Sequence, residues 1–136
     1  MGWSEFFRLT FTEGILDVRL KALLGAHMAR LLGSEVWFRP LWEKARGLTE
    51  KEAGALLDFE GAPLSLREKA ALRYSERITT DSLAADEELF LDLKRHFSDP
   101  ELIELGLVVG MMNGTFRLSH SLGLGEAGGP QWIEGR

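Results

Sequence analysis

The segment from Ser98 to Leu122 constrains the fold of this chain more than any other part of the sequence. It reads SDPELIELGLVVGMMNGTFRLSHSL, with Ser98 or Asp99 as a helix cap and Pro100 at the first helical position. Its middle, LIELGLVVGMM, is apolar on nearly every side, and a helix that is apolar all round is buried on all sides. In a chain of 136 residues, this pattern predicts a helix that is central to the domain or covered by a neighbouring subunit.

The rest of the sequence is also helical in pattern. Apolar residues at three- and four-residue steps predict further helices over about 16–33, 38–46, 49–58, 65–79 and 85–97. Thr49 with Glu52 and Ser65 with Glu68 have the spacing of a capping box, and Pro40 fits only the first turn of a helix. No alternating run between hairpin turns indicates a strand. We therefore expect a single all-α domain over residues 1–136, with about six or seven helices.

The composition argues against several classes of function. A net charge of −5 argues against nucleic acid as a partner, because phosphate binding rests on clustered Lys and Arg. The absence of cysteine removes disulfides, thiolate nucleophiles and thiolate metal ligands together. The three histidines, His27, His96 and His120, show no metal-ligand spacing. We therefore expect neither a metal nor a cofactor.

The N-terminal segment and the low content of Asn, Gln and Cys bear on the localisation and source of the protein. The start of the chain, MGWSEFFRLTFTEG, lacks the features of a signal peptide, and no run reaches about 18 apolar residues. We expect a cytoplasmic protein that does not bind membranes. Asn and Gln occur once each, and together with the missing cysteine this matches the depletion of heat-labile residues in thermophiles. A thermophilic source is our hypothesis.

His27, Ser34 and Glu35 are the candidate catalytic residues. His27 precedes Ser34 by about two helical turns on the same face, so its imidazole would serve as a general base beside the hydroxyl. The alternative is a core histidine bonded to a backbone carbonyl. Ser34 equally suits the N-cap of the next helix, and Glu35 suits the first turn, where the helix dipole favours a carboxylate.

Trp37, Asn113, Arg117 and His120 are the candidate ligand-binding residues. Trp37 belongs to a group of aromatics that either walls an apolar ligand cavity or packs in the core or an interface. The other three residues lie one turn apart on an otherwise apolar helix, and buried polar groups need partners. They form either an internal or interface network, or a clamp for the anionic or carbonyl group of a ligand.

One stretch of the sequence resembles a known family. LSLREKAALRYSERITTDSLAADEELFLDLKRHFSDPELIELGLVVGMMNGTFRLSHSLGLG is similar to the second half of the carboxymuconolactone decarboxylase and alkyl hydroperoxidase D (AhpD) superfamily. In the first half of the chain, the segment LDVRLKALLGAHMARLLGSE resembles the helix that leads into the dithiol of that family, in length and in the spacing of its apolar residues. The resemblance covers about residues 16–124 and leaves 125–136 as a tail that we expect to be mobile.

The resemblance implies an all-helical, AhpD-like fold that assembles as a homotrimer or homohexamer. One branch of the family reduces peroxides through a C-x-x-C dithiol with a nearby His and Glu, and the other acts on a lactone. Here the cysteine positions fall on Ser34 and Trp37, the glutamate position falls on Ala22, and residues 38–43 contain no histidine. Without cysteine, thiol-dependent peroxidase activity is excluded on composition.

Two classes of function therefore remain. In the first, the protein binds or converts a small, partly apolar acid or carbonyl compound by acid/base chemistry in a rebuilt pocket. In the second, it is a non-catalytic binding or scaffold homologue in which the ancestral site has become packing. A cavity beside Ser34 and Trp37 that Arg117 or His120 reaches would favour the first class.

Overall fold

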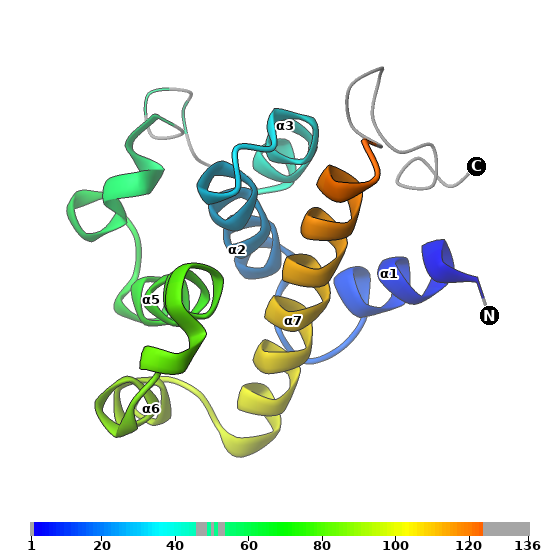
Figure 1. Cartoon of the computed structure of the whole chain (residues 1–136). Coiled ribbons are helices and arrows are strands. Elements are labelled where there is room, and N and C mark those ends of the chain that lie inside the picture. The colour runs from blue at the N-terminus through cyan, green and yellow to red at the C-terminus, as the bar shows by residue number, and fades with distance from the viewer. Residues whose placement is uncertain (1, 46–48, 50, 52–53, 124–136) are drawn as a thin grey trace.

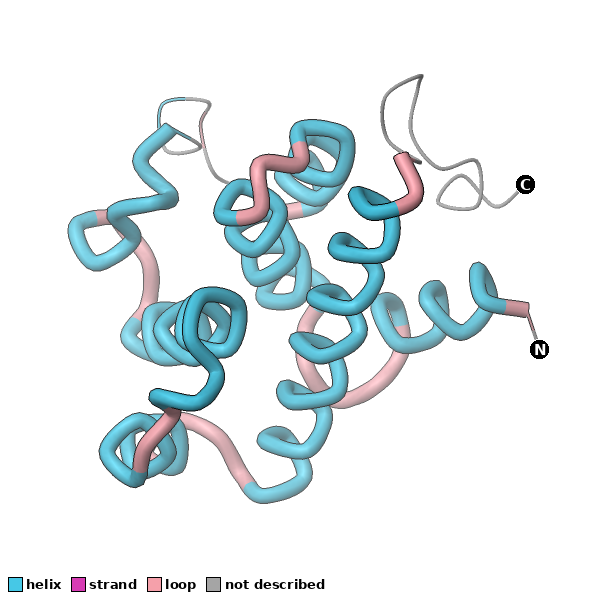
Figure 2. Tube along the Cα trace, viewed as in Figure 1, coloured by secondary structure: helices cyan, strands magenta, loops and turns pink. Residues whose placement is uncertain are grey.

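Helices make up the fold of the computed structural model, which describes residues 2–45, 49, 51 and 54–123. This part of the chain contains no strand, as Figure 2 shows, and the all-α prediction is confirmed. The elements are α1 (Trp3–Thr12), α2 (Val18–Leu31), α3 (Glu35–Lys44), the 3-10 helix η1 (Ala55–Gly61), α5 (Leu66–Asp81), the 3-10 helix η2 (Ser82–Ala84), α6 (Glu87–Lys94) and α7 (Asp99–Ser121). The predicted tail, Gly47 and Glu52 lie outside the described residues.

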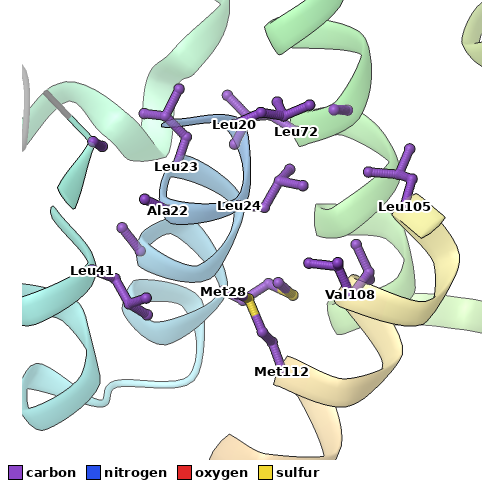
Figure 3. Close-up of a cluster of buried hydrophobic side chains, with 14 of the residues drawn as sticks. Leu20, Ala22, Leu23, Leu24, Met28, Leu41, Leu72, Leu105, Val108 and Met112 are labelled. Carbon is purple, nitrogen blue, oxygen red and sulfur yellow. The ribbon is translucent and has the colours of Figure 1, made fainter. Parts of the chain in front are cut away.

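Helix α2 forms the centre of the fold. It packs against α3, α5 and α7, and every residue from Leu20 to Ala29 is buried. Figure 3 shows Leu24 and Met28 of α2 beside Val108 and Met112 of α7 in the shared core. Because α2 is enclosed by three helices, the side chains at all its positions in this run are removed from water.

Helix α7 is buried along one side only. Leu105, Val108 and Met112 are fully buried, whereas Ile103 and Leu107 are 68% and 64% exposed. The prediction of a helix that the domain itself buries on all sides is therefore wrong for the single chain. The physical reason is that α2 takes the central position, so α7 packs against it with its inner side, and none of the described residues covers the outer side.

Helix α1, which the sequence pattern did not predict, is held in place by a buried lysine. Lys21 Nζ donates to the carbonyl oxygens of Thr10 at 2.8 Å and Glu13 at 2.5 Å, where α1 ends. Glu104 of α7 accepts from the amides of Ile15 and Leu16 at 3.1 and 2.5 Å, and its carboxylate lies 3.7 Å from Lys21. This network fixes α1 beside α7, as Figure 1 shows.

Two capping boxes define the starts of α5 and α7. The Ser65 hydroxyl accepts from the Glu68 amide at 3.0 Å and the Glu68 carboxylate accepts from the Ser65 amide at 3.1 Å, as predicted. The same reciprocal pair joins Ser98 and Glu101 at the start of α7. Such a box satisfies two amides that would otherwise lack intrahelical partners.

The start of α3 and the end of η1 differ from the predictions. Helix α3 begins at Glu35 rather than near 38, so Pro40 lies inside it rather than in its first turn. An internal proline costs one backbone hydrogen bond. The burial of Trp37, Phe38 and Leu41 offsets this cost. The 3-10 helix η1 continues to Gly61, three residues beyond the predicted end of the helix over 49–58.

Candidate functional site

The junction between α2 and α3 is a tight turn built around glycine. Gly33 has a φ of 71°, a conformation that L side chains rarely adopt. The Ser34 amide donates to the Ala29 carbonyl at 2.7 Å and the Gly33 amide donates to the Arg30 carbonyl at 3.1 Å. This pair of bonds is a Schellman motif, which ends α2 and starts α3 within a few residues.

Ser34 is the N-cap residue of α3, as the sequence allowed, but its side chain makes no capping hydrogen bond. The first amides of a helix have no intrahelical acceptor, and together with the helix dipole they attract negative charge. Glu35 in this turn is exposed and lies 3.8 Å from Arg30, which offsets its charge. The Ser34 side chain therefore supplies no acceptor to the first amides of α3.

A pocket of about 320 Å³ lies between the start of α3 and the end of α7. Its lining residues are Gly33, Ser34, Glu35, Val36, Trp37, Ser119, His120 and Gly123. The tertiary structure thus brings together four of the predicted site residues from two distant parts of the sequence. We refer to this site as the α3–α7 pocket.

The walls of the α3–α7 pocket differ in polarity. Trp37 is 1% exposed and its ring packs against Phe116 at 5.0 Å between centroids, with 39° between the planes. Trp37 and Val36 thus supply the apolar wall, while Ser34, Ser119 and the exposed His120 supply polar groups. This combination suits a small molecule with one polar end and one apolar end.

Ser119 is a pocket residue that the sequence reasoning missed. Its side chain is buried, with 4% exposure, and its Oγ has no hydrogen-bond partner in the described chain. A buried hydroxyl without a partner is costly, and most buried polar groups have one. The sequence alone does not distinguish Ser119 from a helical serine whose hydroxyl donates to a backbone carbonyl of the same helix. Ser119 therefore adds a buried hydroxyl to the polar groups of the pocket lining.

His27 does not line the α3–α7 pocket, although it lies on the helix that leads into it. The ring is fully buried, with Nε2 3.4 Å from the Glu76 carboxylate and its centroid 5.3 Å from the Phe59 ring. Desolvation by burial lowers the pKa of His27, against the opposing effect of Glu76. The structure therefore pairs His27 with Glu76 of α5 instead of with Ser34.

Asn113 and Arg117 also lie away from the pocket and bind α5. Asn113 Nδ2 donates to Thr79 Oγ1 and to the Val109 carbonyl, both at 3.1 Å. Arg117 Nη2 donates to the Thr79 carbonyl at 2.6 Å. Asn113 and Arg117 therefore take part in an internal hydrogen-bond network, which was one of the two interpretations of the sequence. Of the three polar residues on this helix, His120 is the one that lines the pocket.

Among the described residues, no group of three or more His, Cys, Asp or Glu residues could hold a metal ion. Nor does any helix in this part of the chain have the length and apolar character needed to cross a membrane.

No protein-family model and no curated protein matches the sequence. Solved structures do match: a peroxidase-related protein from Silicibacter sp. TM1040 has a TM-score of 0.77 at 18% identity, over 87% of this chain and 64% of that protein. A putative antioxidant defence protein AhpD from Agrobacterium tumefaciens has a TM-score of 0.77 at 20% identity, over 87% of this chain and 84% of that one. A variant of the debrominase Bmp8 in complex with 2,3,4-tribromopyrrole has a TM-score of 0.75 at 17% identity, over 96% and 72%.

These matches show the fold. The chain has the all-helical, AhpD-like architecture that the sequence resemblance predicted, and it contains no cysteine. It spans 64% of the length of the Silicibacter protein, so that protein includes a substantial part without a counterpart here.

Proposed function

We propose that the α3–α7 pocket binds a small, partly apolar acid or carbonyl compound, and that the protein acts on it without thiol redox chemistry. The observation that carries this proposal is the convergence of an unpartnered, buried Ser119 hydroxyl and an uncapped helix start in one pocket. The Ser119 hydroxyl has no hydrogen-bond partner in the described chain, and the start of α3 receives no acceptor from the Ser34 side chain. A carboxylate or carbonyl oxygen is the acceptor they fit.

The remaining lining residues support the same ligand class. Val36 and Trp37 give the apolar part of a ligand a surface to contact. His120 carries an imidazole, the side chain that most often serves as a general acid or base. The debrominase Bmp8, which shares the fold, is described in complex with tribromopyrrole, a small ring compound of this size range.

Acid/base chemistry is the mode of action that the pocket supports. Ser34 and Trp37, which stand at the cysteine positions of the resemblance, have no sulfur to offer. Glu35 and His120 are the titratable groups that line the pocket, and one of them would have to move a proton. His27 is paired with Glu76 elsewhere and has no part in this proposal.

The scaffold interpretation is the second candidate, and one observation favours it. Asn113 and Arg117 are engaged in internal hydrogen bonds, and Trp37 packs against Phe116. Much of the predicted site has therefore become part of the fold. Ligand binding at Ser119 distinguishes the two candidates, because a scaffold needs no occupant there.

Binding is tested by the change in melting midpoint that small aromatic acids and lactone acids produce. We expect one or more of these acids to raise the melting midpoint of the wild-type protein. Ser119→Ala should weaken that binding about tenfold, because one hydrogen bond to a charged oxygen is lost. Ser121→Ala is the matched control, since Ser121 lies on the same helix and its hydroxyl already donates to the Leu118 carbonyl.

A second variant tests the charge of the bound group. Glu35→Gln removes a negative charge from the pocket lining, so it should tighten the binding of an acid and leave a neutral carbonyl compound unaffected. No shift with any compound of the panel would overturn the proposal in favour of the scaffold. An equal effect of Ser119→Ala and Ser121→Ala would place the ligand elsewhere.

A further inference from the structure

Two hydroxyl side chains of α7 are buried without a hydrogen-bond partner in the described chain. Thr115 is 1% exposed and Ser119 is 4% exposed, and neither the Thr115 Oγ1 nor the Ser119 Oγ has such a partner there. The two residues are four positions apart, so they lie one turn apart on the same side of the helix. Ser119 lines the α3–α7 pocket, and Thr115 lies one turn nearer the start of α7.

Other helical serines and threonines of this protein satisfy their hydroxyls locally. A hydroxyl in a helix commonly donates to the carbonyl three or four residues earlier. The structure shows this bond for Thr10, Thr12, Ser75, Thr79, Thr80 and Ser121. Thr115 and Ser119 have the same local option, but their hydroxyls do not make the bond. These two hydroxyls are therefore not used by their own helix.

An oxygen atom between these two side chains would be within reach of both hydroxyls. Cβ atoms four residues apart on a helix are separated by about 5–6 Å, and an O–H···O bond is about 2.7–2.8 Å long. Each Cα–Cβ bond is tilted toward the helix N-terminus, so the Ser119 side chain leans toward the turn that carries Thr115. A buried hydroxyl that stays unpaired destabilises the fold, which favours an acceptor at this point.

We infer that Thr115 is a second specificity-determining hydroxyl of the α3–α7 pocket, and that Thr115 and Ser119 donate to one carboxylate oxygen of an acid. This inference rests on the proposed function and narrows it, because it selects acids over neutral carbonyl compounds. Both hydroxyls are buried, so the carboxylate is the end of the ligand that reaches deepest. The apolar part of the ligand then stays beside Val36 and Trp37.

Charge decides between an acid and a neutral carbonyl compound. A hydrogen bond to an ionised oxygen is about twice as strong as one to a neutral oxygen, so two donors on one oxygen favour a carboxylate. The dipole at the start of α3, which lines the same pocket, also favours negative charge. Glu35 is the like charge in the lining, and Arg30 lies 3.8 Å from it and offsets it. The electrostatics of the pocket therefore favour an acid.

Matched pairs of acid and amide test the inference, with benzoate against benzamide and phenylacetate against phenylacetamide. The members of a pair have the same shape and differ in charge. We expect the acid of a pair to raise the melting midpoint of the wild type more than its amide does. Thr115→Val should weaken binding of the acid about tenfold in titration calorimetry, and binding of the amide less, because one bond to a charged oxygen is lost. Thr115→Ser, which keeps the hydroxyl, should bind as the wild type does.

Thr80→Val is the matched control for this substitution. Thr80 is exposed on α5 and its hydroxyl already donates to the Glu76 carbonyl, so this variant should bind both compounds as the wild type does. Wild-type affinity of Thr115→Val for the acid, or an equal weakening of acid and amide, would overturn the inference. If Ser119→Ala still weakened binding in that case, the proposed function would stand without it. If no acid, amide or lactone acid bound the wild type, the proposed function would fail and the inference with it.

The stability of the free protein gives a second readout. Valine has nearly the shape of threonine, and at position 115 it removes a buried hydroxyl that has no partner in the described chain. Thr115→Val should therefore melt at or above the wild-type midpoint in the absence of ligand. Thr79→Val should melt lower, because the Thr79 hydroxyl accepts from Asn113 and donates to the Ser75 carbonyl. A loss in Thr115→Val as large as that in Thr79→Val would show that the Thr115 hydroxyl is already bonded in the free protein, and it would overturn the inference.

Discussion

Two fully buried titratable side chains on α2 show how much a polar residue depends on its partners. Lys21 is surrounded by the carbonyls of Thr10 and Glu13, which accept from its ammonium group. His27 has no hydrogen-bond partner on either ring nitrogen within the described residues, and Glu76 lies at 3.4 Å. These hydrogen bonds offset the cost of burying Lys21, whereas burial lowers the pKa of His27 and so favours its neutral form.

The state of His27 predicts how stability depends on pH. Its folded pKa lies below the ordinary value of 6.5, so the unfolded chain binds a proton that the folded chain resists. The free energy of unfolding should therefore fall as pH decreases below about 6.5, and this group should contribute no slope above that. Urea denaturation of the wild type and of His27→Gln across this range measures the effect.

His27→Gln should show a weaker dependence on pH in that window than the wild type. Equal slopes in the wild type and His27→Gln would show that His27 is not the group responsible.

At the level of elements, the turns between helices depend on two glycines with positive φ. Gly33 ends α2 with a φ of 71°, and a Cβ added there would meet nothing within 4 Å. Gly14, between α1 and α2, has a φ of 101°, and a Cβ added there would overlap the Glu104 carboxylate. That carboxylate cannot shift freely because it accepts from the amides of Ile15 and Leu16.

This difference predicts unequal effects of the same substitution. Gly33→Ala should lower the free energy of unfolding by about 1 to 2 kcal/mol, the cost of a left-handed backbone at an L residue. Gly14→Ala should cost more, about 3 kcal/mol or above, because steric overlap adds to the backbone strain. Chemical denaturation of the two variants compares them directly, and an equal loss in both would contradict the role assigned to Glu104.

At the level of the whole molecule, ion pairs join the helices on the outside of the core. Arg73 of α5 contacts Glu60 at 2.7 Å and Asp92 of α6 at 2.9 Å, so one guanidinium links three elements. Arg67 contacts Glu101 at 2.6 Å and, with the Ser98 amide, lowers the pKa of Glu101 to about 2. The contribution of such networks to the stability of the fold increases with temperature, because the free-energy cost of removing charges from water decreases.

The network and the depletion of heat-labile residues together predict a heat-stable protein. We expect a melting midpoint above about 65 °C, beyond the range of about 45–65 °C typical of mesophilic domains. Differential scanning calorimetry measures this midpoint directly. A value near about 50 °C would contradict the hypothesis of a thermophilic source.

Local features of the fold could be read from the sequence because they depend on residues close together in the chain. The capping box of Ser65 with Glu68 and the glycine stop at Gly33 each involve positions within one helical turn. The predicted start of α3 is too late because a proline inside a helix is unfavourable when only the local sequence is considered. In the folded protein, the burial of Trp37 stabilises a helix that begins at Glu35 and includes Pro40. Helix α1 was missed because Lys21 and Glu104, which hold it, lie elsewhere in the sequence.

By itself, the sequence determined that this protein is an all-α chain that contains no cysteine, because composition and helical periodicity are local properties. Only the tertiary structure decided which polar residues meet. It placed Ser34 and Trp37 beside His120 and the unpartnered Ser119, and it turned His27 toward Glu76. The physical reason is that contacts between distant segments depend on how the helices pack around α2. The residues adjacent to a given position in the sequence do not determine that packing.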